Sequence, residues 1–343
     1  MDAALRDGLG ARRALTMSWD PIRITVSSSD ADLLRAVRTR YARHLTTSEP
    51  GPGRGDVVCV VDSALYARLA ESHADSATVA EVDDGGRAAV VRDGARHVVV
   101  ANHGGPAAAV LVTRLVRAKA YADLYGAGWL PLHASSVVDG AGNAIVLVGP
   151  RMSGKTSLLL SLLDADAGSL LSNDSLFVQP HGSTLVSRAL PVSLGIRDDV
   201  MRIYPQLKDL SDDLGKIHVD NTRQPHGPHD RVYAGPDLVA AAFGAELART
   251  GKVKAVVAVS YVPEPDAFEM ARVDDATAAE TVETSRLDRQ TSWASEWLDV
   301  PAAHAAGRRR SGLAVRELDV GFFRLRFGAG ARSQATAELL ELL

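Results

Sequence analysis

The sequence predicts an α/β protein in which a small α+β N-terminal domain precedes a larger domain built on a phosphate-binding loop. Three observations lead to this prediction. The chain has 343 residues, about twice the length of an ordinary domain. Runs rich in β-forming residues alternate with segments of helical period. A glycine-rich loop at 149–156 lies between an apolar run and a helical segment. We divide the chain into a flexible tail at 1–18, the N-terminal domain at 19–128 and the phosphate-loop domain at 129–343.

The composition excludes several classes of protein. Apolar residues make up 46% of the chain and charged residues 23%, so neither a disordered nor a collagen-like chain is expected. The 38 basic and 42 acidic side chains give a net charge of −4 without a long basic stripe, so we expect no nucleic-acid partner. No window approaches a membrane span of about 18 apolar residues, and the N-terminus lacks a signal-peptide core. A cytoplasmic protein without a membrane partner is the expectation.

Within the N-terminal domain the residue pattern predicts both strands and helices. Residues 21–26 alternate like an edge strand, and residues 30–44 carry leucine and valine at helical spacing after a Ser/Asp cap. Cys59, the single cysteine, lies in an apolar run and is expected to be a buried strand thiol. We find no catalytic constellation in this domain. Its remaining expected elements are a strand, a three-stranded meander and a long helix, at 57–61, 78–82, 88–91, 97–101 and 104–125.

The second domain opens on two β-rich runs, residues 130–138 and 144–148, which flank a short turn containing glycine. This pattern predicts an antiparallel hairpin. Its second strand leads directly into 149–156, with the sequence GPRMSGKT. The segment after the loop has helical character, and Gly168 is expected to close that helix. A strand, a loop and a helix in this order are the context that a phosphate loop requires.

The loop fits the pattern G-x-x-x-x-G-K-[ST], whose chemistry is specific. Its glycines allow backbone N–H groups to turn inward around phosphates, and the N-terminus of the next helix adds positive potential. Lys155 is expected to reach the outer phosphates and Thr156 to offer its hydroxyl to Mg²⁺. The chain is therefore predicted to bind ATP with Mg²⁺. The residues expected to contact the nucleotide are Gly149, Pro150, Arg151, Met152, Ser153, Gly154, Lys155, Thr156 and Ser157.

A phosphate loop also needs a carboxylate on the metal side, which ordinary P-loop proteins place at the end of a later apolar strand. The best later strand here, residues 254–262, is followed by Pro263 and Glu264 and has no Asp. Asp174 is the nearer choice, since it follows a short apolar run 19 residues after Lys155. The alternative for Asp174 is an ordinary turn residue between two short strands.

Three segments, Leu132–Val138, Gly149–Thr156 and Leu170–Asp174, together resemble the HPr kinase/phosphorylase family, which shares its P-loop core with phosphoenolpyruvate carboxykinase. The close match covers about 130 to 200, and the N-terminal domain does not look like that of the bacterial HPr kinases. The resemblance implies an HPr-kinase type of P-loop domain, in which a β-hairpin feeds the Walker A loop. It also allows a homo-oligomer, without fixing the oligomeric state, and places the chain among HPr-kinase-like proteins, some of which accompany peptide natural-product pathways.

The resemblance further implies roles for individual residues. His133 matches a family histidine just before the hairpin, and a purely structural role is its alternative. In the family, two adjacent acids have different roles. One helps to deprotonate the acceptor hydroxyl, and the other holds the metal. Asn173 stands in the place of the first acid and cannot accept a proton at neutral pH. Asp174 keeps the second place, so Thr156 and Asp174 are the expected Mg²⁺ ligands.

Several other charged residues have either a role at the site or a simpler structural role. Arginine forks suit phosphate charge, and we expect Arg197 at the site ahead of Arg188 and Arg231. The pair Asp198-Asp199 either supplies the missing base or is an acidic pair at a helix N-terminus. The histidine-containing loop at 218–230 is interpreted as a lid or acceptor-binding loop rather than a metal site.

The predicted function is an ATP-dependent phosphotransferase that acts on a hydroxyl, either a Ser or Thr of a peptide or small protein or a small-molecule alcohol. Lys155 and the loop amides, with Mg²⁺ on Thr156 and Asp174, would position the phosphates and stabilise their charge. The alternative is a nucleotide-binding regulatory or partner-binding module without phosphoryl transfer. Asn173 favours this alternative because it cannot accept a proton at neutral pH.

Overall fold

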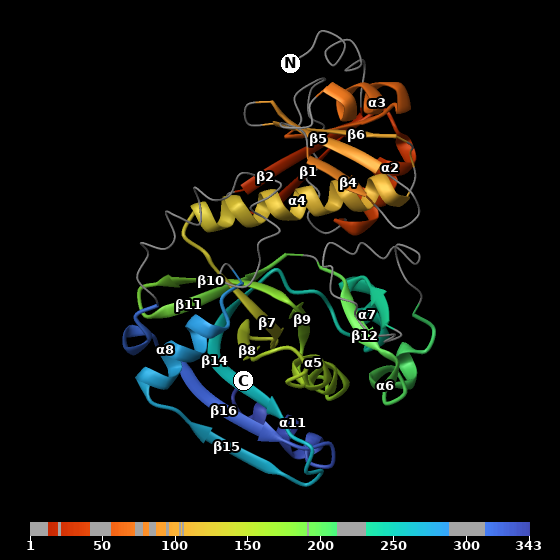
Figure 1. Cartoon of the computed structure of the whole chain (residues 1–343). Helices are drawn as coiled ribbons and strands as arrows, with labels where there is room; N and C mark the ends of the chain where they lie inside the picture. Colours follow the sequence, from red (N-terminus) through yellow and green to blue (C-terminus); the bar gives the residue numbers. More distant parts are fainter. Residues whose placement is uncertain are drawn as a thin grey trace. The chain divides into compact units, whose positions relative to one another are not determined.

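The computed structural model describes residues 13–19, 22–41, 56–72, 78–81, 87–93, 96–102, 104, 106–190, 192–210, 231–287 and 313–343. These residues belong to two compact units, divided between Leu124 and Tyr125 (Figure 1). Each unit mixes strands with helices, so the α/β class is confirmed. Within the described ranges, no helix is long and apolar enough to cross a membrane.

The first unit contains a six-stranded sheet in the order β1-β2-β3-β6-β5-β4. Strands β2, β3 and β6 run parallel to one another, and β4, β5 and β6 form the expected antiparallel meander. Cys59 on β3 is buried, as expected. The strands are β1 Arg13–Trp19, β2 Ile22–Ser28, β3 Val57–Val61, β4 Thr78–Glu81, β5 Arg87–Asp93 and β6 Arg96–Ala101; the helices are α2 Ala31–Arg40, α3 Ser63–Ser72 and α4 Pro106–Gly126.

Two expectations for this unit are wrong. Residues 13–18 of the expected tail belong to β1, which pairs antiparallel with β2 along its whole length. Strand β2 therefore lies between β1 and β3 and is not an edge strand. The physical reason is burial, because Leu15 and Met17 of β1 pack into the core of the unit. Their apolar contribution offsets the entropy that is lost when the segment becomes ordered.

Helix α3 was not expected from the sequence, although a local signal exists. The carboxylate of Asp62 accepts the backbone N–H groups of Ala64 and Leu65, both at 2.9 Å, and so caps the helix. Leu65 and Leu69, four residues apart, are buried in one cluster with side chains of β3 and β6. A capping acid followed by apolar residues at this spacing is sufficient to predict a helix.

The second unit is built on a sheet in the order β11-β10-β7-β8-β14-β16-β15, with β9 paired to β7. Strands β7 and β8 form the expected antiparallel hairpin, and β14 runs parallel to both β8 and β16. The strands are β7 Leu130–Val138, β8 Asn143–Val148, β9 Ser169–Ser172, β10 Ser175–His181, β11 Thr184–Ala189, β14 Thr250–Tyr261, β15 Phe268–Arg272 and β16 Gly321–Phe327, with β12 Leu194–Arg197 and β13 Arg231–Ala234 paired separately.

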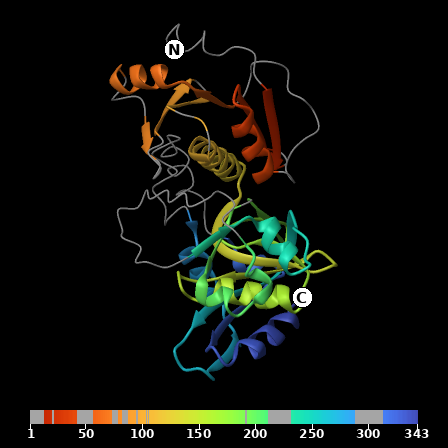
Figure 2. The same ribbon diagram turned by 90° about the vertical axis from the view of Figure 1, so that its right-hand side faces the viewer.

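Helices cover both faces of this sheet because the side chains of its central strands alternate. Along β8, Ile145 and Leu147 join the core under α5 and α11, whereas Val146 and Val148 join the core under α8. Figure 2 shows α5 and α11 on the same side of the sheet. The helices are α5 Lys155–Asp164, α6 Asp198–Met201, α7 Pro236–Ala242, α8 Asp275–Thr284 and α11 Arg332–Leu340, with short 3₁₀ turns η2 Pro205–Leu207 and η4 Val315–Glu317.

Candidate functional site

The loop that follows β8 lies close to the ends of β14 and β16. Gly149, Met152 and Gly154 adopt φ angles of +148°, +68° and +93°. A Cβ atom at Gly149 would lie 2.7 Å from the carbonyl oxygen of Val259, and one at Gly154 would lie 2.7 Å from Cζ of Phe327. Both positions therefore require glycine. Met152 holds a left-handed conformation that is rare outside glycine, and such outliers cluster at ligand-binding sites.

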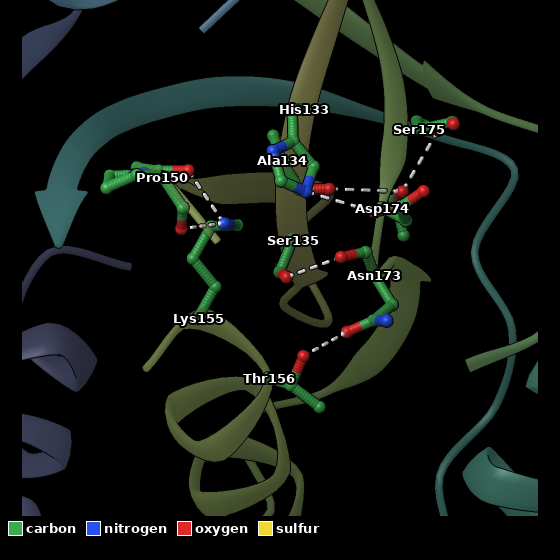
Figure 3. Close-up of polar contacts among 11 residues, drawn as sticks. His133, Ala134, Ser135, Pro150, Lys155, Thr156, Asn173, Asp174 and Ser175 are labelled. Carbon is green, nitrogen blue, oxygen red and sulfur yellow. Dashed lines mark hydrogen bonds and ion pairs between the residues drawn. The ribbon is translucent and has the colours of Figure 1, made fainter. Parts of the chain in front are cut away.

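Lys155, the first residue of α5, directs its side chain back into the loop (Figure 3). Its ammonium donates hydrogen bonds to the carbonyl oxygens of Gly149 (2.7 Å) and Pro150 (3.0 Å). Burial lowers the pKa of Lys155 from the usual 10.5 to about 8, although the carboxylate of Asp174 acts in the opposite direction. The loop thus encloses a cation that titrates within reach of physiological pH.

We expect the affinity for ATP to fall as the pH rises from about 7 to about 9. A lysine with a pKa of about 8 is mostly charged at the lower pH and mostly neutral at the higher one. Phosphate binds the charged form, so binding at high pH must include proton uptake and should weaken about tenfold. Titration calorimetry in buffers of different ionisation enthalpy measures both quantities. Lys155→Arg keeps its charge throughout this range, so any binding that it retains should not vary with pH. A wild-type profile that is equally flat would contradict the prediction.

Ser153 places a hydroxyl inside the same loop. Only 5% of the residue is exposed, and its Oγ has no hydrogen-bond partner in the described part of the chain. Buried polar atoms are normally hydrogen-bonded, so this hydroxyl fits a ligand that brings its own acceptor atoms. Together with the ammonium of Lys155, the hydroxyl makes the interior of the loop suitable for a polyphosphate.

Asn173 lies in the turn between β9 and β10 and connects that turn to the start of α5 (Figure 3). The hydroxyl of Thr156 donates to Oδ1 of Asn173 at 3.1 Å. The hydroxyl of Ser135, which is fully buried on β7, donates to the backbone carbonyl of Asn173 at 2.7 Å. The side chain in direct contact with Thr156 is therefore Asn173, whereas the resemblance implied that Asp174 shares the metal with Thr156.

His133 and Asp174 contact one another from β7 and the turn before β10. Nε2 of His133 lies 3.1 Å from Oδ1 of Asp174, and the strand register Ser175↔His133 produces this proximity. The backbone holds both ends of the contact, since Ala134 N–H donates to the Asp174 carbonyl (3.3 Å) and His133 N–H donates to the Ser285 carbonyl (2.8 Å). A carboxylate repels an imidazole lone pair, so the proton of the neutral ring belongs on Nε2 and the lone pair on Nδ1.

Arg197, at the end of β12, reaches the exposed part of the loop. Its Nη1 donates to the sulfur of Met152 at 3.3 Å, and its Nε pairs with the carboxylate of Asp199 at 3.1 Å. A thioether is a weak acceptor, so a phosphate oxygen would replace it at little cost. Asp198 and Asp199 lie in the first turn of α6, which is the helix N-terminal position that the sequence offered as one explanation.

The remaining expected residues fall in different places. Arg151 is exposed, and Ser157 is half-buried within α5. The guanidinium of Arg188 lies 4.8 Å from the centroid of the Trp129 ring, on the β10–β11 side of the sheet. The side chain of Arg231 and the loop at 218–230 lie outside the described residues.

Two residues near the loop were not singled out by the sequence. Ser135 on β7 donates to the backbone carbonyl of Asn173, and a pair of serines in a strand with the length and flanking apolar residues of a core strand is a signal that could have drawn attention to it. Tyr261 is the last residue of β14, and its Cβ lies 3.4 Å from the position that a Cβ on Gly154 would take. An aromatic residue at the carboxyl end of a parallel strand is a usable signal, because ligands of α/β sheets bind at that edge.

The chain is similar to the Hpr(Ser) kinase/phosphatase from Coxiella burnetii, with 8% sequence identity and a TM-score of 0.29, over 62% of this chain and 93% of that chain. A scan against protein-family models gives no match, and a search of the curated proteins gives none either. Similarity at this level assigns neither a family nor a function to the chain.

Proposed function

We propose that the chain is an ATP- and Mg²⁺-dependent phosphotransferase whose acceptor is a hydroxyl, on a Ser or Thr of a peptide or small protein or on a small-molecule alcohol. One observation carries the proposal, which is that the pair His133–Asp174 lies beside the phosphate loop. The pair is tied to the loop because Asn173, next to Asp174, is hydrogen-bonded to Thr156. Nucleotide binding alone needs the loop, whereas transfer to a hydroxyl also benefits from a proton acceptor at this place.

The residues present fit a nucleotide with its cation. The buried Oγ of Ser153 and the ammonium of Lys155 would contact the phosphates, and Thr156 and Asp174 would hold Mg²⁺. Mg²⁺ is commonly bound by one or two protein carboxylates together with substrate phosphates. No group of three His, Cys, Asp or Glu side chains placed to hold a metal occurs in the described ranges, and this mode of binding needs none. When bound, Mg²⁺ neutralises negative charge on the transferring phosphoryl group.

The chain's own residues would position the reactants and take up the proton. The acceptor oxygen forms a bond to the terminal phosphorus while the bond to the ADP oxygen breaks, so the hydroxyl proton must leave. His133 would accept that proton at Nδ1, and Asp174 would stabilise the resulting imidazolium through Nε2. Lys155 and Arg197, which both reach the loop, would stabilise negative charge on the phosphate oxygens.

A comparison of alanine variants at Asp174 and Asn173 tests whether Asp174 holds the cation. Asp174→Ala should lose most of the increase in ATP affinity that Mg²⁺ provides, because a carboxylate is a much better Mg²⁺ ligand than an amide. Asn173→Ala removes the partner of Thr156 but no charge, and should keep most of that increase. Calorimetric titrations with Mg²⁺ and with EDTA measure the difference for each variant. The reverse order of effects would assign the cation to the amide oxygen of Asn173 and the hydroxyl of Thr156.

The proposed function is tested by transfer itself. The full chain is incubated with ATP and Mg²⁺ together with acceptor peptides, proteins or alcohols nominated by the neighbouring genes. Mass spectrometry then measures phosphate incorporation, and Lys155→Ala provides the blank. Incorporation by the wild type at a Ser, Thr or alcohol oxygen, and not by the variant, is the expected result.

The second candidate is a nucleotide-binding regulatory module without transfer, and Asn173 is the residue that favours it. An amide cannot take a proton at neutral pH. The position that holds the first acid in the HPr kinase family therefore cannot supply a base in this chain. Tight binding of ATP without phosphate incorporation into any of the nominated acceptors would contradict the phosphotransferase and support this module.

A further inference from the structure

Strand β14 extends past its neighbour β8 and runs alongside the phosphate loop. The last residue pair between the two strands is Ala258↔Val148, after which β8 turns into the loop while β14 continues to Tyr261. The backbone oxygen of Val259 lies against Gly149, and Cβ of Tyr261 lies against Gly154. The final residues of β14 therefore form a wall along the loop, and Tyr261 stands at the end of this wall.

The ring of Tyr261 packs against a buried aromatic ring, and about half of the residue is exposed to solvent. Tyr261 pairs in register with Phe327 of β16, and their rings meet edge to face with centroids 5.6 Å apart at 76°. Phe327 is 1% exposed, whereas Tyr261 is 49% exposed. Because the buried ring holds the exposed one in place, little conformational entropy remains for a stacked ligand to remove.

Exposed apolar side chains occur at the loop itself. Four large apolar side chains stand out as exposed in the described ranges, and two of them, Met152 and Tyr261, belong to the loop or contact it. The loop offers hydrogen-bond donors and a cation to phosphates, but phosphates make no use of an aromatic face. A purine base does, because it is flat, apolar on both faces and joined to the phosphates of the same molecule.

We infer that Tyr261 is the platform on which the base of a purine nucleoside triphosphate stacks. The inference rests on the proposed function, since it extends the phosphate site of that function to the base of the same nucleotide. Stacking on an aromatic side chain tolerates different bases, so adenine and guanine would both be accepted. The phenol oxygen has no part in this role, and phenylalanine would serve equally well.

The test compares ATP with inorganic tripolyphosphate, which is a triphosphate chain without the ribose and the base. Tyr261→Ala should weaken the binding of Mg²⁺-ATP about tenfold or more, towards the affinity for tripolyphosphate, and leave tripolyphosphate binding unchanged. Tyr261→Phe should bind ATP like the wild type. Leu238→Ala, which removes another exposed apolar side chain on α7, should change neither affinity. Calorimetry measures all of these affinities without requiring an acceptor or turnover.

The outcomes separate this inference from the function on which it rests. Equal weakening of both ligands in Tyr261→Ala would make Tyr261 a structural support of the loop and overturn the inference. Equal wild-type affinity for ATP and tripolyphosphate would overturn it as well, while the phosphate site would stand. Binding of neither ligand by the wild type would contradict the proposed function itself, and the base platform with it.

Discussion

Replacing Lys155 by alanine should abolish detectable binding of Mg²⁺-ATP in calorimetry. The ammonium is buried within the loop and already donates two hydrogen bonds to loop carbonyls. Phosphate oxygens would take over those donors, and each hydrogen bond to a charged partner contributes about 1.5–3 kcal/mol. Loss of both weakens binding about 10²-fold or more. Unchanged affinity in the variant would remove the loop from the function altogether.

A measurement of stability shows whether the loss of ATP binding results from unfolding. The pKa of Lys155 is about 8 in the folded chain and near its usual 10.5 in the unfolded chain, so the fold disfavours the charged form. This cost is fully present below a pH of about 8 and disappears as the pH rises towards about 10.5. Lys155→Met should therefore raise the free energy of unfolding by about 1–3 kcal/mol at neutral pH. Urea denaturation of Lys155→Met measures this value, and the same measurement on Lys155→Ala shows whether that variant is folded. A large fall in stability would mean that lost binding reports damage to the fold.

Replacing His133 by alanine should lower phosphate transfer by about 10²–10⁴-fold while ATP affinity changes little. The imidazole contacts Asp174 through Nε2, and its removal leaves that carboxylate and Lys155 in place to hold the cation and the phosphates. With a loose, metaphosphate-like transition state, positioning carries much of the rate, which places an upper bound on the effect. Phosphate incorporation measured by mass spectrometry gives the rate, and calorimetry gives the affinity.

Two variants serve as controls for this prediction. His181→Ala removes an exposed histidine at the end of β10 and should transfer like the wild type. Asn173→Asp keeps an oxygen in the place that accepts the hydroxyl of Thr156, so it should be tolerated and transfer at least as fast as the wild type. Full activity of His133→Ala would exclude this histidine from the proton transfer and leave it a structural residue.

Local pattern was sufficient for much of the second unit. Alternating apolar residues around a glycine-containing turn predicted the hairpin of β7 and β8, and the motif GPRMSGKT predicted the turn into α5. These predictions succeed because strand pairing across a short turn and the start of a helix depend on neighbouring residues. The same local reasoning failed for β1, whose partner β2 can be recognised only once the burial of Leu15 and Met17 is known.

By itself the sequence predicted a glycine-rich loop between a strand and a helix, and it placed His133, Asn173 and Asp174 in the same unit as that loop. Only the tertiary structure decided which of them meet. Asn173 and Asp174 are adjacent in one turn, yet one contacts Thr156 and the other His133. Asp174 lies beside His133 because the next residue, Ser175, pairs with His133 in the register between β10 and β7. That register is set by burial on both faces of the sheet, a condition that no short stretch of sequence contains.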